Sequence, residues 1–352
     1  MKQLKVGIAG YGLVGKHRRK CIDSNQNLKL VAVCDKTLPK SGIFEDGIRY
    51  YDHYHGLLNE ELDILFVCLT NDVAPKVTIA GLNKGINVFC EKPPGRNLED
   101  ISKVIACEKN HPNLKLMYGF NHRYHYSVRE ALNIVYSGEL GKVINLRAVY
   151  GKSKLITFNQ PDWRTKREIA GGGILLDQGI HIVDLIRLFA GEFNEVYSFI
   201  SNNHWKYNVE DNAYAIMRTQ HGVVAMLHSS ATQWRHRFEL DITLEKGSII
   251  LGGILSTSKS YGAETLRIAW ASDDDVGDPK EQVTRYNSDP SWDEEVKYFV
   301  KSILSGSPII NSSSMEAYKT MELVYKIYCA DPIWKEKYQL SDKVEELCPA
   351  IL

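Results

Sequence analysis

Three glycines near the start of the chain have the spacing of a phosphate-binding turn. Gly10, Gly12 and Gly15 form a GxGxxG pattern that follows an apolar run and opens a helix-like stretch. In such a turn the first glycine allows the tight bend, the second lets the backbone approach a pyrophosphate, and the third lets the helix pack on the strand. Asp35 follows the next apolar run, twenty residues beyond Gly15, where a carboxylate can bind an adenosine ribose. The pattern predicts a dinucleotide site that prefers NAD to NADP, because a carboxylate repels a 2′-phosphate, although Lys36 could reach such a phosphate.

A second chemical signal is a polar stripe in an otherwise apolar segment. Asp177, His181 and Asp184 fall at i, i+4 and i+7, which places them on one face of a helix. Polar groups on a mostly buried helix must be satisfied by partners or used in function. An imidazole, whose unperturbed pKa is ~6.5, suits a base that removes a hydroxyl proton during alcohol oxidation. The same spacing also fits an Asp–His pair that only braces the helix, or a metal site. The metal site lacks an evident third ligand, and we expect no metal.

The first third of the chain must position the glycine turn. It alternates short apolar runs with helical patterns, which predicts an N-terminal α/β domain over residues 1–120, a Rossmann dinucleotide-binding domain with a parallel sheet. The predicted strands are Leu4–Ala9, Leu28–Cys34, Ile64–Leu69, Asn87–Cys90 and Leu114–Tyr118, and the predicted helices are about Leu13–Ser24, Ala74–Lys84 and Leu98–Asn110.

After Phe120 the pattern changes to one strand after another with short turns. This predicts a C-terminal α+β domain over residues 121–352 with an open, mostly antiparallel sheet. The polar stripe makes it the candidate substrate-binding domain, and an outer sheet face with apolar alternation favours oligomers. The terminal helices of this domain could pack back on the first domain. The predicted strands are Val143–Tyr150, Glu195–Ser201, Asn212–Arg218, Val223–Ser229, Arg237–Leu244 and Ser248–Leu251, and the predicted helices are about Val128–Ser137, one from Gly173, Trp292–Ser305 and Met315–Cys329.

Composition excludes several classes of protein. The chain of 352 residues carries 43 Lys and Arg against 43 Asp and Glu, so it lacks the basic excess of a nucleic-acid binder. The seven cysteines form no metal-binding spacing and are expected to be reduced thiols. The N-terminus enters a strand directly, and no uninterrupted apolar run reaches the ~18 residues needed to span a bilayer. We therefore expect a cytoplasmic protein without a membrane partner.

Further motifs resemble one protein family. The segments Cys90–Gly95 (CEKPPG), Gly119–Tyr124 (GFNHRY) and Gly171–Asp184, together with the glycine turn, resemble the Gfo/Idh/MocA oxidoreductases from about residue 4 to residue 330. The resemblance implies a Rossmann domain followed by an open mixed sheet, a nicotinamide cofactor, a sugar-like or cyclic polyol substrate, and a homodimer or homotetramer formed through the sheet. By motif position, Lys92 corresponds to the lysine of the family's EKP motif, and Asp177 and His181 correspond to its acid and base pair.

These observations combine into a site hypothesis. His181 acts as the base, Asp177 hydrogen-bonds a substrate hydroxyl or orients the base, and Lys92 hydrogen-bonds the reacting or a neighbouring oxygen. Trp163 can stack on a sugar face and Arg164 can hold an anion or a hydroxyl, although a packed surface loop is an equal alternative. The predicted cofactor-binding residues are Gly10, Gly12, Leu13, Val14, Gly15, Asp35, Thr70, Asn71, Glu91 and Lys92. The predicted substrate-binding residues are Lys92, Arg123, Tyr124, Trp163, Arg164, Asp177 and His181.

The sequence is compatible with three functions. The first is an NAD-dependent dehydrogenase acting on a CH–OH group of a sugar, polyol or derivative. The second is a glycoside hydrolase that retains NAD and oxidises its substrate transiently. The third is a non-catalytic NAD-binding sensor, against which the joint presence of Lys92, Asp177 and His181 argues.

Overall fold

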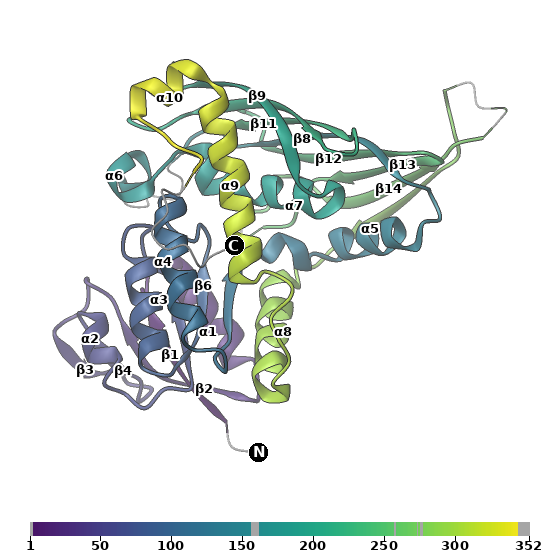
Figure 1. Ribbon diagram of the computed structural model, residues 1–352. Helices are drawn as coiled ribbons and strands as arrows, with labels where there is room; N and C mark the ends of the chain where they lie inside the picture. The colour runs from purple at the N-terminus through teal and green to yellow at the C-terminus, as the bar shows by residue number, and fades with distance from the viewer. Residues whose placement is uncertain (1–2, 156–161, 257, 273, 275–276, 344–352) are drawn as a thin grey trace. The chain divides into compact units, whose positions relative to one another are not determined.

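The computed structural model describes residues 3–155, 162–256, 258–272, 274 and 277–343 (Figure 1). The chain forms two compact units. The first unit comprises Met1–Phe120, Trp292–Lys319 and Lys343–Leu352, and the second comprises Asn121–Ser291 and Thr320–Asp342.

The first unit is built on a seven-stranded sheet in the order β3-β4-β2-β1-β5-β6-β7. All neighbouring strands are parallel except the antiparallel pair β3 and β4. The order reverses at β1, so the crevice beside its carboxyl end is the topological switch point at which doubly wound sheets bind ligands. The strands are β1 (Leu4–Ala9), β2 (Leu28–Cys34), β3 (Ser41–Ile43), β4 (Arg49–Tyr51), β5 (Ile64–Val67), β6 (Asn87–Glu91) and β7 (Leu116–Gly119).

Helices connect and cover these strands. They are α1 (Leu13–Asp23), α2 (Tyr54–Leu57), α3 (Ala74–Asn83), α4 (Leu98–Lys109) and α8 (Ser291–Ser305). The strands β1, β2, β5, β6 and β7 are mostly apolar because both of their faces are largely buried, whereas β3 and β4 are half-buried or exposed. Phe299 of α8 packs edge-on against Phe66 and Phe89 of the sheet, at ring-centroid distances of 6.4 and 5.6 Å. The hairpin of β3 and β4 and the short α2 were not predicted.

The second unit is built on an eight-stranded sheet in the order β15-β14-β13-β12-β8-β11-β10-β9. Only the pair β8 and β11 is parallel, so the sheet is mixed and mostly antiparallel. The two sheets confirm the predicted fold class. The strands are β8 (Val143–Gly151), β9 (Phe193–Ser201), β10 (Asn212–Thr219), β11 (Val224–Ser230), β12 (Arg237–Leu244), β13 (Gly247–Gly252), β14 (Glu264–Trp270) and β15 (Glu281–Tyr286), of which the last two were not predicted.

Helices lie along one face of this second sheet (Figure 1). They include α5 (Tyr126–Ser137), α6 (Arg167–Ala170), the π-helical turn η3 (Leu175–Gly179) and α7 (Ile180–Ala190), and short 3₁₀ turns η1 (Asn121–Tyr124) and η2 (Asp162–Thr165) precede them. The remaining helices are α9 (Ser314–Ala330), within which the division between the units falls, and α10 (Pro332–Tyr338).

The helical stretch Arg167–Ala190 is long and apolar enough to cross a membrane by length and composition alone. However, 89% of its most apolar window is buried inside the protein. The fold itself therefore covers the apolar surface of this helix.

Candidate functional site

The three glycines of the turn after β1 meet three different requirements. Gly10 has a φ of +92°, and a Cβ there would lie 2.2 Å from the carbonyl oxygen of Cys68. A Cβ on Gly15 would lie 2.0 Å from the carbonyl oxygen of Gly10, so only glycine lets α1 pack this closely. A Cβ on Gly12 would meet no atom within 4 Å. The fold therefore requires Gly10 and Gly15, whereas Gly12 faces open space.

The start of α1 fits the pyrophosphate of a dinucleotide. Gly12 is the N-cap of α1 and no side chain caps the helix there. The first backbone N–H groups of a helix lack intrahelical acceptors and carry partial positive charge. Leu13, the first helical residue, is 61% exposed. Gly12 leaves the backbone open, so these N–H groups are available to an anion.

Asp35 directly follows β2 and is held in place by its neighbours. One carboxylate oxygen accepts a hydrogen bond from the Tyr11 backbone N–H at 2.9 Å. The other accepts bonds from the backbone N–H and the hydroxyl of Thr37, at 3.0 and 2.7 Å. Each carboxylate oxygen has two lone pairs, so Asp35 can also accept a bond from a ribose hydroxyl. Lys36 beside it is exposed.

The other predicted cofactor residues end neighbouring strands of the same sheet. Thr70 and Asn71 follow β5, and the Thr70 carbonyl accepts hydrogen bonds from the next turn of backbone, while Asn71 is buried. Glu91 ends β6 and accepts a 2.6 Å bond from Nε of the fully buried Arg18. Lys92 follows directly, half-buried, before the cis peptide bond to Pro93. Parallel strands end at one edge, so these residues share the edge that carries the glycine turn and Asp35.

In the second unit, Asp177 is the centre of a charged cluster. Its carboxylate accepts hydrogen bonds from Lys152 Nζ at 3.2 Å and from Arg164 Nε at 3.1 Å. The Arg164 guanidinium also lies over the ring of Trp163, 4.4 Å from its centroid. Trp163 and Arg164 are both half-buried, and residues 159–161, which precede them in the predicted loop, lie outside the described residues. The structure thus brings Arg164 to Asp177 and adds Lys152, which the sequence reasoning missed.

The backbone that carries Asp177 is a π-helical turn instead of the expected α-helix. Asp177 lies in η3, and α7 starts at Ile180, just before His181. The wider turn changes which residues share a face, so the predicted stripe is not continuous. π-helical turns inside helices often occur at functional sites.

A buried glutamate anchors the start of this helix. The carboxylate of Glu210 accepts hydrogen bonds from the backbone N–H groups of Gly173 at 2.8 Å and Leu175 at 3.0 Å, and from the Tyr328 hydroxyl at 2.6 Å. Burial raises the pKa of Glu210, while these bonds favour its charged form. A Cβ on Gly173 would lie 2.1 Å from the Glu210 carbonyl oxygen, so glycine is needed for this approach.

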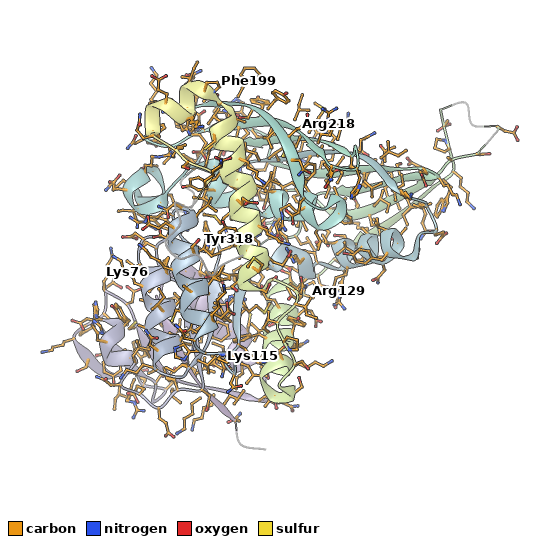
Figure 2. The ribbon with its side chains drawn as sticks, viewed as in Figure 1. Lys76, Lys115, Arg129, Phe199, Arg218 and Tyr318 are labelled. Carbon is orange, nitrogen blue, oxygen red and sulfur yellow. The ribbon has the colours of Figure 1, made fainter. Side chains whose placement is uncertain are left out.

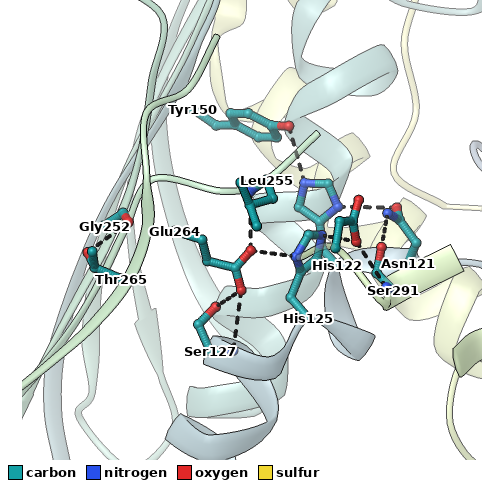
Figure 3. Close-up of polar contacts among 11 residues, drawn as sticks. Asn121, His122, His125, Ser127, Tyr150, Gly252, Leu255, Glu264, Thr265 and Ser291 are labelled. Carbon is teal, nitrogen blue, oxygen red and sulfur yellow. Dashed lines mark hydrogen bonds and ion pairs between the residues drawn. The ribbon is translucent and has the colours of Figure 1, made fainter. Parts of the chain in front are cut away.

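His181 lies flat against a second histidine. Its ring and that of His122 have centroids 3.8 Å apart and are inclined by only 10°. Both side chains are buried. His122 Nε2 lies 3.1 Å from the Tyr150 hydroxyl, and its Nδ1 lies 3.2 Å from the Asn121 side-chain oxygen (Figure 3). Burial raises the pKa of Tyr150 well above its usual range, so its hydroxyl keeps its proton.

Asp184, the third residue of the predicted stripe, pairs with Arg123 instead. Arg123 Nε and Nη2 donate to the two carboxylate oxygens of Asp184 at 2.7 and 2.6 Å, and both side chains are buried. This pair uses Nε and Nη2 of Arg123, and the predicted substrate contact of Arg123 stays a prediction. Tyr124, which follows in η1, is also buried.

Other polar residues near Asp177 were not singled out from the sequence. The Tyr261 hydroxyl donates a 3.2 Å bond to the Gln178 side chain, and its ring packs against Tyr150 with centroids 5.3 Å apart. Lys152 directly follows β8, and its place at a strand end is the only sequence signal it offers. Among the described residues, no group of three or more His, Cys, Asp or Glu side chains could hold a metal ion.

The structure combines a parallel sheet, whose glycine turn suits a dinucleotide, with a second unit that carries a cluster of charged and imidazole side chains. Comparison with protein families agrees: residues 4–120 match the oxidoreductase family with an NAD-binding Rossmann fold, and residues 128–250 match the GFO/IDH/MocA C-terminal domain. Together these cover about two thirds of the chain. The chain belongs to the Gfo/Idh/MocA family of NAD-dependent oxidoreductases.

Individual relatives are distant but cover most of the chain. Inositol 2-dehydrogenase of Salmonella typhimurium is 24% identical over 324 residues, which are 90% of each chain. The 1,5-anhydro-D-fructose reductase of Ensifer adhaerens is 30% identical over 59% of this chain and 62% of that protein. Among solved structures, levoglucosan dehydrogenase in complex with NADH has a TM-score of 0.81 at 18% identity, covering 95% of this chain and 98% of that one.

Proposed function

We propose that this protein oxidises a hydroxyl-bearing carbon of a sugar, a cyclic polyol or a related derivative, with NAD as the hydride acceptor. The observation that carries the proposal is that one helical segment carries both a buried imidazole, His181, and a carboxylate, Asp177, that two cations bond. The relatives named for inositol, 1,5-anhydro-D-fructose and levoglucosan support the substrate class, because all three are cyclic polyhydroxylated compounds.

The first unit would hold the cofactor by its own residues. Backbone N–H groups at Gly12, Leu13 and Val14 would bind the pyrophosphate, and Asp35 would accept a bond from the adenosine ribose. Thr70, Asn71 and Glu91 belong to the same strand edge and complete the predicted cofactor contacts. When bound, NAD supplies an electrophilic ring carbon that takes the hydride of the alcohol.

His181 removes the hydroxyl proton in this proposal. A ring nitrogen takes the proton of the substrate hydroxyl as the hydride leaves the same carbon, which yields a carbonyl and an imidazolium. Burial of the ring and its stacking on His122 fix its orientation, so little reorganisation is needed when the proton moves.

Asp177 orients the substrate. Lys152 and Arg164 balance its negative charge and fix the carboxylate, which leaves oxygen lone pairs for a substrate hydroxyl. Trp163, whose ring supports Arg164, offers an apolar face to a sugar ring. Lys92 is assigned to the reacting oxygen or its neighbour, where its positive charge favours alkoxide character. Arg123 and Tyr124, both buried, complete the predicted substrate-binding residues.

We also propose that the protein forms a homodimer or homotetramer through the second sheet and acts in the cytoplasm. The strands β9, β10 and β11 alternate between buried and exposed residues, and their outer positions carry large apolar side chains. These include Tyr197, Phe199, Tyr214, Ile216 and Met226, which are between 49% and 80% exposed. Contiguous exposed apolar side chains of this size indicate an interface, and a second copy of the same face would cover them.

The base assignment is tested by His181→Ala. The variant should bind NADH like the wild type but lose turnover by at least about 100-fold, because general base catalysis contributes factors of this order. Asp177→Asn should lower turnover and raise the KM for the sugar while leaving NADH binding unchanged. Unchanged turnover in His181→Ala would remove the base assignment.

A further inference from the structure

The stacked histidine pair has an asymmetric set of partners that the proposed reaction does not yet use. His122 and His181 lie ring to ring at 3.8 Å, a separation at which two positive charges repel strongly when both are buried. The pair can therefore hold one proton with ease but not two. Which ring takes that proton decides whether His181 can act as a base.

Hydrogen bonds around His122 bear on the tautomer of its neutral ring. Asn121 Nδ2 donates to Ser291 Oγ at 2.9 Å, so its Oδ1 is the atom that faces His122 Nδ1 (Figure 3). An amide oxygen only accepts, so Nδ1 of His122 carries the hydrogen. On the other side the Tyr150 hydroxyl can donate to Nε2 at 3.1 Å. Both ring nitrogens are thus satisfied in the neutral Nδ1–H tautomer.

The other ionisable groups near the pair are distributed on both sides of it. His125 lies edge-on to His122, with ring centroids 5.5 Å apart, and is itself hydrogen-bonded through Nδ1 to Glu264 at 2.8 Å. Burial opposes the charge of Glu264, but the bonds from His125 and Ser127 lower its pKa. The further groups are Tyr150 and Tyr261 on the strand side, and on the helix side Asp177 with Lys152 and Arg164, and Asp184 with Arg123. Each carboxylate of this set has its own hydrogen-bond donors.

We propose that His122 is a positioning residue for the base. Held neutral as its Nδ1–H tautomer by Asn121 and Tyr150, it supports the flat face of His181 and leaves His181 as the ring of the pair that takes the substrate proton. This inference rests on the proposed function, in which His181 is the base.

Asn121→Asp tests the proposal with an almost isosteric change. A carboxylate at this position would accept the Nδ1–H bond and stabilise a positively charged His122, which would then oppose a proton on His181. We expect kcat to fall at least about tenfold and the acid limb of the kcat/KM profile to move to lower pH by about one unit or more. An acid limb that stays in place, or moves to higher pH, would overturn the proposal.

Ser291→Ala is the matched control. It removes the hydrogen-bond partner on the far side of Asn121 without introducing a charge. A merely structural role of this network predicts similar losses of kcat in both variants and no displacement of the acid limb in either. The proposal predicts a displaced acid limb in Asn121→Asp alone.

Nitrogen NMR of the wild-type protein keeps the proposal testable if a variant does not fold. With ¹⁵N-labelled histidine, and His122→Gln to assign the resonance, His122 should show a protonated Nδ1 and an unprotonated Nε2 from about pH 6 to 8. A neutral Nε2–H tautomer, or a doubly protonated ring, would overturn it. If His181→Ala retains turnover, the proposed base is overturned as well. If His181→Ala is inactive but the acid limb of Asn121→Asp does not move, only the role of His122 is overturned.

Discussion

Gly12 and Gly15 stand three residues apart in one turn but are glycine for different reasons. Gly15 is required by the fold, because its Cβ position is occupied by the Gly10 carbonyl oxygen. Gly12 has no neighbour within 4 Å at its Cβ position, so only a ligand would need it to be glycine. A substitution can therefore separate folding from cofactor binding.

We predict that Gly12→Ala folds normally and binds NADH at least about tenfold more weakly, since the added methyl group occupies the approach to the helix N-terminus. Thermal unfolding and NADH fluorescence titration measure the two effects. Gly15→Ala is the contrast, and its Tm should fall by several degrees because the new Cβ clashes with backbone. Wild-type NADH affinity in Gly12→Ala would contradict the assigned phosphate position.

The two cations that bond Asp177 lead to a second prediction. Lys152→Met keeps most of the side chain's apolar stem but removes the ammonium group that bonds Asp177. The kcat/KM for the sugar should fall about tenfold or more, because a charge-assisted hydrogen bond contributes about 1.5–3 kcal/mol. NADH affinity should not change. Lys154 is an exposed lysine two residues away, and Lys154→Met is the control, which should leave kcat/KM unchanged. Equal kcat/KM in the two variants would remove Lys152 from the site.

Residue types and spacing predicted part of this site and could not predict the rest. The glycine turn and Asp35 could be found because their chemistry depends on local backbone shape. The partners of Asp177 and Asp184 could not, because Lys152 and Arg123 reach them from elements distant in the sequence. Arg123 illustrates the consequence: its type suggested an anion-binding residue, but the fold pairs it with Asp184.

At the scale of elements, hydrophobic alternation located most strands within a residue or two. It missed β3, β4 and β15, which are short or mostly exposed and carry little apolar pattern. It also missed β14, although Leu266 and Ile268 of that strand are buried in alternation. It also missed the π-helical turn, because one wider turn leaves the apolar periodicity almost unchanged. That turn depends on Glu210, a buried carboxylate that bonds the backbone from a separate segment.

His228, on strand β11, should make the stability of the protein depend on pH. Burial lowers the pKa of His228, which stacks on Tyr214 at a ring-centroid distance of 4.0 Å. As pH falls below about 6.5, the unfolded chain binds a proton at this residue that the folded chain does not yet bind, so the free energy of unfolding decreases. His228→Gln should make unfolding less dependent on pH between about pH 7 and 5. Urea unfolding at about pH 7 and pH 5 measures the free energy of unfolding of the wild type and of His228→Gln. If it changes equally with pH in both proteins, His228 makes no contribution to the pH dependence.

For the whole molecule, the exposed apolar face of β9, β10 and β11 is the feature that a single chain leaves unexplained. Phe199, labelled in Figure 2, is 80% exposed and Ile216 is 52% exposed. A charge at the centre of such an interface would be buried without a partner. We predict that Ile216→Asp converts the oligomer to a monomer, as measured by light scattering coupled to size-exclusion chromatography.

A control variant keeps this prediction specific. Ile310→Asp changes an equally large apolar side chain that is 74% exposed but lies outside the second sheet. It should leave the mass unchanged. A wild-type protein that is already monomeric, or an Ile216→Asp variant of unchanged mass, would contradict the proposed interface.

The central claim is that this chain oxidises a sugar or polyol hydroxyl with net reduction of NAD. The most direct measurement follows NADH absorbance while the purified protein and NAD are mixed with a panel of sugars, cyclic polyols, glycosides and nucleotide sugars, with NADP in parallel. The account predicts that NADH accumulates with at least one cyclic polyhydroxylated substrate, that NADP supports a slower reaction, and that His181→Ala abolishes it. Release of an aglycone from a glycoside without net NADH would contradict the claim and identify a hydrolase that retains its cofactor.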